Sequence, residues 1–364
     1  MKRILLTGGG TGGHVYPLLA VAECLAGHEC RYFGPAHDQW RSVVHDAGIP
    51  ISHIAGAKLR RYFSMKNILE GPIFVWSVLQ ALAKVAWFRP HAAFSKGGPG
   101  ALPTVIACRL YGVPVIIHES DSVPGRASRI TGTWARIVEL GWKEAAKYFP
   151  DKETHAVGVP IRRALLDERT MERTAALAAF GMDSGLPVLL VIGGSQGSGR
   201  LNAQVLRTLP KLLETHRILH QVGAANWGMH MAAYEDMKKT LPESAVARYL
   251  PFAYLDEKMG AAYRAADCTV SRAGSAIFEL AAFGVPAVLV PLPESAHDHQ
   301  LTNARIYAAT GAAGVLEEKE MTDARFIDAI RGMTGNAAAH EAATEFAKPD
   351  AARAIATDIL KIAA

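Results

Sequence analysis

The chain opens twice in the same way, and this repeat limits the folds that it can adopt. Near the start, the apolar run Ile4–Leu6 stops at the glycine-rich stretch Gly8–Gly13, and apolar residues then recur at helical spacing. Near the middle, the apolar run 187–192 stops at the glycine-rich stretch 193–197, and a helical pattern follows again. A short apolar run, a glycine turn and a helix are typical of the βαβ unit of a parallel sheet. Each half therefore predicts an α/β domain of its own.

A second pair of segments matches across the two halves. Ala93–Gly98 and Thr269–Gly274 each indicate a strand that ends in a serine, a basic residue and a glycine turn. Each leads through a helix to a Gly-Val-Pro triplet and a further apolar strand. We predict two Rossmann-like domains with parallel sheets that face each other across a cleft, and a length of 364 residues agrees with two cores. The turn at Gly158–Pro160 marks the boundary, so the domains are residues 1–160 and 161–344.

Coarse helix predictions complete the second half. The segment from Thr170 to Gly185 has a helical pattern and leads into the second sheet. The alanine-rich tail from Ala337 to Ala364 is predicted to be helical.

Composition restricts the class of protein and its partners. With 50% hydrophobic and 20% charged residues, the chain is globular, and its net charge of +5 favours anionic partners over any specific nucleic-acid interface. Four cysteines without a C-x-x-C pair indicate reduced thiols in a cytosolic protein. We expect no signal peptide before the first strand, and we expect the longest apolar stretch, Ile73–Ala83, to be too short to span a bilayer.

The first glycine stretch indicates a phosphate-binding loop, although a tight structural turn explains the same glycines. Parallel sheets bind ligands at the carboxyl ends of their strands, where a glycine loop and a helix N-terminus favour anions. A nicotinamide cofactor requires an acid after the second strand, but Arg31–Phe33 is followed by Gly34–His37. An ATP-type loop is excluded because no Lys-Ser/Thr follows the glycines.

Three further features indicate chemistry at these strand ends. His14 directly follows the first loop, where a neutral imidazole can take a proton from a hydroxyl, although a packing role explains it equally well. Glu279 lies early in the helix after Ser271–Gly274, where a carboxylate can bind a ribose or merely favour the helix dipole. The polar run His297–Asn303 suits the hydroxyls of a sugar, and we expect no metal there.

Together these residues resemble the peptidoglycan-synthesis N-acetylglucosaminyltransferases of the MurG family over nearly the whole chain. The matching motifs, in family order, are Gly9–Pro17, Ser95–Gly98, His118–Gly125, Gly158–Arg162, Gly193–Gly197, Ser271–Gly274 with Glu279, and Gln300 with Asn303. The resemblance implies a GT-B fold and transfer of N-acetylglucosamine from its UDP donor to the muramyl sugar of lipid I, with inversion and without a cofactor or a required metal. It also implies that a C-terminal helix, about 345–364, joins the first domain.

The resemblance assigns the first domain to the acceptor and the membrane and the second to the UDP-sugar. The implied contacts of the donor are Thr11, Gly12, Gly13, Asp121, Arg162, Ser195, Leu255, Ser275, Ala276, Glu279 and Gln300. The loop Lys96, Gly97 and Gly98 is implied for the acceptor and the diphosphate. His14 is the first candidate for the general base and Asp121 the second.

The stretch from Lys58 to Arg89 has two interpretations. Basic residues surround apolar and aromatic ones there, a pattern that binds anionic bilayers, and the lipid acceptor favours this interpretation. The alternative is a buried core helix with a solvated basic rim. The first interpretation predicts a peripheral protein on the cytoplasmic face of the cell membrane.

Two other functions fit the same pattern. One is a GT-B glycosyltransferase with a different lipid or a soluble acceptor. The other is a UDP-sugar epimerase on the same pair of domains, which would act without any lipid acceptor.

Overall fold

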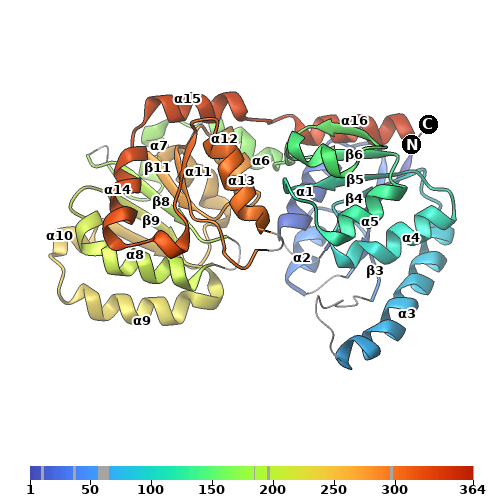
Figure 1. Ribbon diagram of the computed structural model, residues 1–364, viewed down its shortest axis with the longest axis horizontal. Helices are drawn as coiled ribbons and strands as arrows, with labels where there is room; N and C mark the ends of the chain where they lie inside the picture. The colour runs from blue at the N-terminus through green and yellow to red at the C-terminus, as the bar shows by residue number, and fades with distance from the viewer. Residues whose placement is uncertain are drawn as a thin grey trace. The chain divides into compact units, whose positions relative to one another are not determined.

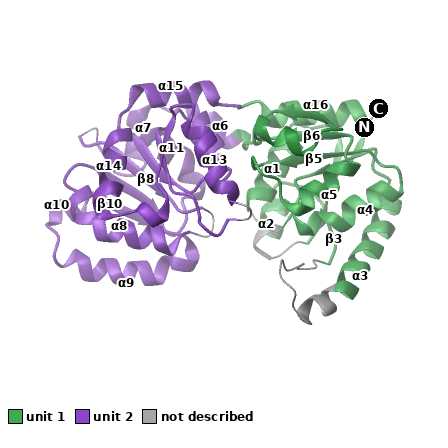
Figure 2. Ribbon diagram, in the orientation of Figure 1, with its two compact units in different colours: residues 1–163, 349–364 green, residues 164–348 purple. Residues whose placement is uncertain are grey.

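The computed structural model describes residues 1–9, 12–35, 38–55, 65–183, 185–194, 197–295 and 298–363, with the backbone alone at 38–40 and 65–70. The chain divides into two compact units, residues 1–163 with 349–364 and residues 164–348 (Figure 2). Both units are α/β structures.

The first unit contains a seven-stranded parallel sheet in the order β3-β2-β1-β4-β5-β6-β7. Its strands β3, β4, β5 and β6 are labelled in Figure 1. Its strands are β1 Arg3–Thr7, β2 Glu29–Gly34, β3 Ile51–His53, β4 Ala92–Ser95, β5 Val115–Glu119, β6 Ile137–Leu140 and β7 Glu153–Ala156. The strand order changes direction between β1 and β4. Ligands of such sheets bind outside the carboxyl ends of the strands at this point.

Helices cover both faces of the first sheet. Alternate residues of β1 point to opposite faces, so Ile4 and Leu6 pack in one core and Leu5 packs in the other. The first core includes residues of α1 Gly12–Glu23, α2 Asp38–Asp46 and α16 Ala351–Ile362. The second includes residues of α3 Met65–Phe88 and α4 Leu102–Leu110. The remaining helices of this unit are α5 Arg126–Trp134 and the short 3-10 helices Pro99–Ala101 and Lys143–Tyr148.

The second unit repeats this design with six parallel strands in the order β10-β9-β8-β11-β12-β13. They are β8 Val188–Ile192, β9 Arg217–Gln221, β10 Tyr249–Phe252, β11 Cys268–Ser271, β12 Ala287–Leu289 and β13 Ala313–Val315. The strand order changes direction between β8 and β11. Leu201, Val205 and Leu209 of α8 pack with Phe326 and Ile330 of α14 over one face of this sheet.

The helices of the second unit connect these strands. They are α6 Arg163–Asp167 at the boundary of the units, α7 Arg173–Ala178, α8 Gly199–Leu212, α9 Trp227–Lys238, α10 Glu243–Val246, α11 Met259–Ala265, α12 Ala276–Ala282, α13 His299–Ala308, α14 Asp323–Met333 and α15 Ala337–Phe346. The predicted α/β class with two Rossmann-like domains is confirmed.

Two helix predictions were too long. Among the described residues from Thr170 to Gly185, only Arg173–Ala178 is α-helical, because Gly181 follows with a left-handed φ of +64° that ends a helix. The alanine-rich tail is two helices, α15 and α16, which belong to different units. Pro349 lies between them, and proline lacks the amide hydrogen and disfavours a helical residue before it.

The apolar stretch Ile73–Ala83, which was expected to be too short to span a bilayer, lies within the longer helix α3. The window Gly71–Phe88 of α3 is long and apolar enough, by length and composition alone, to cross a membrane, and 22% of it is buried. Ser77, Ala81, Val85 and Phe88 form a buried stripe on this helix. Since that stripe packs in the core of the first unit, α3 belongs to a globular domain with one uncovered face.

Candidate active site

His14 lies where two loops of the first unit meet at the carboxyl ends of β1 and β4. It occupies the first turn of α1, and its ring packs against Gly9 and Gly98. A Cβ atom on Gly98 would lie 3.2 Å from Nε2 of His14, and one on Gly9 would lie 3.2 Å from Nδ1. These positions therefore need glycine because the imidazole fills the space of a side chain.

Lys96 lies beside His14 and follows β4 directly. Its side chain is buried and its ammonium group donates a hydrogen bond to the hydroxyl of Ser120. Burial lowers the pKa of Lys96, and the nearby carboxylates of Glu119 and Asp121 oppose this shift. One buried cation thus connects the loop after β4 with the loop after β5.

The surroundings of His14 keep its imidazole neutral. Burial first, and the positive charge of Lys96 second, lower its pKa to about 4. A neutral imidazole has a nitrogen that can accept a proton, as a general base must.

Asp121 is held in place by a buried acid of the loop after β5. Its backbone N–H donates a 2.9 Å hydrogen bond to Oε1 of Glu119, whose side chain is buried. Burial and the Asp121 charge raise the pKa of Glu119, while the Ser128 hydroxyl bonds to it. The motif His118–Gly125 contained Glu119, but only the structure reveals this supporting role.

Arg162 also reaches the N-terminal end of α1. Its guanidinium carbon lies 4.1 Å from the centre of the Tyr16 ring, a cation–π contact. The preceding turn is fixed by a 2.8 Å hydrogen bond between Nε2 of His118 and the carbonyl oxygen of Gly158. Arg162 therefore belongs to the first unit, and its contact Tyr16 lies two residues after His14 in the sequence of α1.

In the second unit, the glycine loop after β8 is tightly fitted. Gly194 and Gly197 have left-handed φ angles of +89° and +74°. A Cβ atom on Gly197 would lie 2.1 Å from the carbonyl oxygen of Val222, so no other residue fits there. Ser198 then caps α8 by accepting a hydrogen bond from the N–H of Leu201.

Arg272, which follows β11, connects three segments around this loop. Its guanidinium donates to the carbonyl oxygen of Val290 at 2.9 Å, to Oγ of Ser198 at 2.6 Å and to Oε1 of Glu318 at 2.5 Å. Only 8% of the Arg272 and Glu318 side chains is exposed. The buried ion pair of Arg272 and Glu318 thus holds Ser198 at the N-terminus of α8.

Glu279 lies in the first turn of α12, with Ser275 at the N-cap and Ala276 as the first helical residue. The hydroxyl of Tyr263 donates a 2.7 Å hydrogen bond to its Oε2. Three of the predicted donor contacts, Ser275, Ala276 and Glu279, thus lie at the N-terminal end of one helix.

Two other predicted contacts are tied to the ends of strands. The N–H of Leu255 donates a 3.0 Å hydrogen bond to Oε1 of Gln221 at the end of β9, and its side chain is buried. The side-chain oxygen of Gln300 accepts a 2.9 Å hydrogen bond from the N–H of Leu292, just after β12. Leu255 thus bonds through its backbone, and Gln300 through its side chain, to residues at the carboxyl edge of this sheet.

The structure thus places the predicted residues in two groups. Gly12, Gly13, His14, Lys96, Gly97, Gly98, Asp121 and Arg162 belong to the first unit, and Leu255, Ser275, Ala276, Glu279 and Gln300 belong to the second. Thr11 and Ser195 lie outside the described residues, as does His297. Tyr263 was missed, because a tyrosine in a short apolar helix has no sequence signal for its partner.

Two parallel α/β units with glycine loops at the carboxyl edge of each sheet are the arrangement of the GT-B fold, and the family matches identify the class as a glycosyltransferase. The glycosyltransferase family 28 N-terminal domain matches residues 4–139, and the family 28 C-terminal domain matches residues 188–359. The chain belongs to this family, and within it to the UDP-N-acetylglucosamine–N-acetylmuramyl-(pentapeptide) pyrophosphoryl-undecaprenol N-acetylglucosamine transferases.

The chain is similar to several known proteins over almost its whole length. The transferase of that name from Clostridium kluyveri is 35% identical over 91% of this chain and 91% of its own. A second such transferase, from Bacillus cereus, is 34% identical over 92% of both chains. The crystal structure of Acinetobacter baumannii MurG has a TM-score of 0.75 and 26% identity, and covers 99% of this chain and 100% of its own.

A UDP-GlcNAc 2-epimerase from Neisseria meningitidis has the same fold. Its structure has a TM-score of 0.70 with 11% identity, and covers 99% of this chain and 100% of its own. The epimerase function considered above therefore shares the scaffold, whereas the relatives at 34–35% identity are transferases.

Proposed function

We propose that this enzyme transfers N-acetylglucosamine from UDP-N-acetylglucosamine to the muramyl sugar of lipid I and forms lipid II with inversion. Its relatives span nine-tenths of the chain and are named for this donor and acceptor. The observation that supports the chemistry best is the neutral His14, placed beside the buried Lys96 at the carboxyl edge of the first sheet.

The second unit binds the UDP part of the donor. The carboxylate of Glu279 accepts hydrogen bonds from the ribose hydroxyls, and Tyr263 fixes the orientation of this carboxylate. Leu255, Ser275 and Ala276 contact the nucleotide, and Gln300 contacts the sugar. The loop that contains Ser195 binds the diphosphate with backbone N–H groups, helped by the positive end of α8.

The first unit supplies the reacting groups. Negative charge develops on the leaving diphosphate, and Arg162 with the N–H groups of Gly12 and Gly13 stabilises it. The loop Lys96, Gly97 and Gly98 contacts the acceptor and its diphosphate.

His14 removes the proton from the acceptor hydroxyl as that hydroxyl attacks the anomeric carbon. Its low pKa keeps the imidazole in the unprotonated form at neutral pH. Asp121 is the second candidate, and its fixed backbone places a carboxylate in the neighbouring loop.

The uncovered face of α3 binds the cytoplasmic surface of the membrane, where the lipid acceptor resides. Its exposed apolar residues are Ile73, Val75, Trp76, Leu79 and Trp87, which are 42–66% exposed. Such a surface with tryptophans suits the interface of a bilayer. The basic residues Lys84 and Arg89 flank it, while Lys58, Arg60, Arg61 and Phe63 lie outside the described residues and the side chain of Lys66 is not described.

A transfer assay with labelled donor tests this function. Label from UDP-N-acetylglucosamine should enter a lipid product only when lipid I is present. Transfer to diacylglycerol instead of lipid I, or conversion of the donor sugar in the absence of any acceptor, would favour the other glycosyltransferase or the epimerase.

A further inference from the structure

Three side chains from distant parts of the chain meet on the α16 face of the first sheet. Glu139 belongs to β6, His155 to β7 and Asp358 to α16. Nδ1 of His155 lies 2.8 Å from Oδ2 of Asp358 and 3.5 Å from Oε1 of Glu139. One ligand atom from each residue can be chosen so that all three lie within 4.8 Å of one another.

The position of each group follows from the fold. Glu139 is directly opposite His155 in the parallel register of β6 and β7, so both side chains point to the same face. Asp358 lies on α16, whose Ile355 and Ile359 pack in the core on that face. Packing on both sides therefore fixes the three groups relative to one another.

Glu139 is the group that requires an explanation. Its side chain is fully buried, and among the described residues its carboxylate faces only Nδ1 of His155 at 3.5 Å and the carboxyl group of Asp358, to which it bonds. A buried carboxylate that faces a second acid is costly as long as both carry a negative charge. A proton can neutralise it, since burial and the adjacent Asp358 carboxyl raise the pKa of Glu139 to about 9. A cation between the three groups would satisfy both carboxylates and the imidazole together.

The other nitrogen of His155 has the partner that metal-binding histidines usually have. Nε2 lies 3.3 Å from Oε1 of Glu153, so Nδ1 is directed at Glu139 and Asp358. A carboxylate that orients the ring from its far nitrogen is a regular feature of zinc sites. This contact is independent of the Glu139–Asp358 pair and indicates a ligand in the same place.

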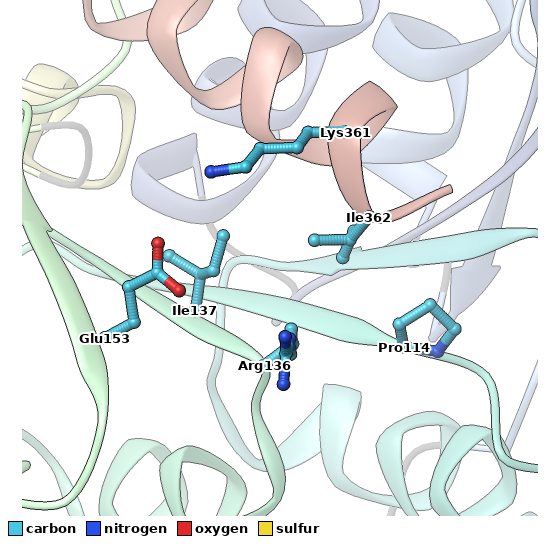
Figure 3. A pocket seen from close by; sticks show the side chains of 6 residues that line it. All are labelled: Pro114, Arg136, Ile137, Glu153, Lys361 and Ile362. Carbon is cyan, nitrogen blue, oxygen red and sulfur yellow. The ribbon is translucent and has the colours of Figure 1, made fainter. Parts of the chain in front are cut away.

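An opening to solvent lies next to the cluster. A pocket of about 260 Å³ is lined by Ile137 and Glu153, which pair two residues before Glu139 and His155, and by Lys361 and Ile362 of α16 (Figure 3). Arg136 and Pro114 complete its lining. Glu153, the carboxylate of the pocket lining, also contacts His155, which itself is not a lining residue.

We propose that Glu139, His155 and Asp358 bind one divalent transition-metal ion, best Zn²⁺, which ties α16 to β6 and β7. One imidazole and two carboxylates are a ligand set that zinc accepts, with a fourth position for water. Because Asp358 and His155 are 203 residues apart in the sequence, the ion would link α16 to the strands of the first unit. This role is structural and is separate from sugar transfer.

Metal binding to the full-length enzyme tests the proposal. After treatment with a chelator and dialysis, the protein should take up one Zn²⁺ per chain, and Co²⁺ in its place should give the visible absorption of a low-coordinate site. Thermal unfolding should shift upward with Zn²⁺ and not with Mg²⁺, since an ion that binds only the folded state stabilises it.

Variants make the test specific. Glu139→Gln and Asp358→Asn should lose the Co²⁺ spectrum and the response of unfolding to Zn²⁺. Glu153→Gln should retain both with about 10-fold weaker affinity. Asp350→Asn is the matched control, because Asp350 is an exposed acid at the start of the same helix whose side chain makes no cap hydrogen bond.

Two results would overturn the proposal. One is wild-type protein that takes up no Zn²⁺, which would leave a proton as the only occupant of the cluster. The other is uptake that is equal in wild type, Glu153→Gln and Asp358→Asn, which would place the ion elsewhere. If Glu139→Gln does not fold, these two variants and the wild-type spectrum still decide between the outcomes.

Discussion

The hydroxyl of Tyr263 in α11 donates a 2.7 Å hydrogen bond to Oε2 of Glu279 in α12. Tyr263 is buried, and burial followed by the charge of Glu279 raises its pKa, so the hydroxyl remains a donor. This hydrogen bond fixes the orientation of the Glu279 carboxylate. In the proposed function, the carboxylate binds the ribose of the donor in this orientation.

Tyr263→Phe should therefore weaken donor binding. Loss of a hydrogen bond to a charged group that remains in place is expected to raise KM for UDP-N-acetylglucosamine about 5–10-fold, with kcat changed less than about 2-fold. Steady-state kinetics measures both. Tyr234→Phe is the control, since Tyr234 is a buried tyrosine of the same unit that packs on Tyr249. Equal KM values in the two variants would contradict a role for Tyr263 at the donor.

Arg272→Lys should destabilise the second unit. A lysine cannot keep three bonds of a planar guanidinium, and Glu318 would remain buried with a poorer partner. We expect a loss of about 2–4 kcal/mol in the free energy of unfolding, measured by urea denaturation. Arg325→Lys is the control, because its pair with Glu320 is exposed and is worth under about 1 kcal/mol. A loss as small as in the control would disprove the structural role of Arg272.

His14→Ala should lower kcat by roughly 10²–10⁴ if His14 is the general base. Circular dichroism and the unfolding midpoint must show that the variant is folded, because the ring also fills space against Gly9 and Gly98. Asp121→Asn separates the alternative. A large loss in Asp121→Asn together with near-normal turnover in His14→Ala would transfer the role of base to Asp121.

The pH profile tests the state of His14 in the wild type. The base acts in its unprotonated form, so activity should fall when the pH drops through its pKa. Because burial and Lys96 lower that pKa to about 4, kcat/KM should show no step near pH 6.5, and its acid limb should lie near pH 4. A titration near 6.5 that disappears in His14→Ala would show that the imidazole is normally solvated in the working enzyme.

The double variant Trp76→Glu with Leu79→Glu should reduce binding to anionic vesicles at low salt by at least about 10-fold, since it places charge on the uncovered face of α3. Sedimentation with vesicles of phosphatidylglycerol measures the bound fraction. Met229→Glu is the control, because Met229 is 77% exposed on α9 of the other unit. Binding that the double variant leaves unchanged would remove α3 from the membrane contact.

Much of the fold was predictable because its signals are local. The two glycine loops, the strands before them and the helices after them follow from apolar periodicity and from the special backbone of glycine. The break between α15 and α16 also had a local signal in Pro349, which the alanine-rich pattern obscured.

For α3, the sequence supported two interpretations, and the structure shows one helix with a buried stripe and an exposed apolar face. The stripe through Ala81 and Val85 is core, and the opposite face, with Trp76 and Leu79, is exposed. Periodicity identifies an apolar helix but does not reveal how many of its sides have partners.

The supporting residues of the site were not predictable because their partners are distant in sequence. The bond from Tyr263 to Glu279, the contacts of Arg272 and the meeting of Glu139 with Asp358 depend on how strands and helices are brought together. Motif residues can be recognised in the sequence, whereas the residues that hold them in place can be recognised only in the structure.

The most direct test of the proposed function is the identity of the product formed from purified enzyme, UDP-N-acetylglucosamine and lipid I. Mass spectrometry should show lipid I gaining one N-acetylhexosamine, and NMR should show the new glycosidic bond in the β configuration, inverted from the donor. An unmodified lipid I, or a product with the retained α configuration, would contradict the account.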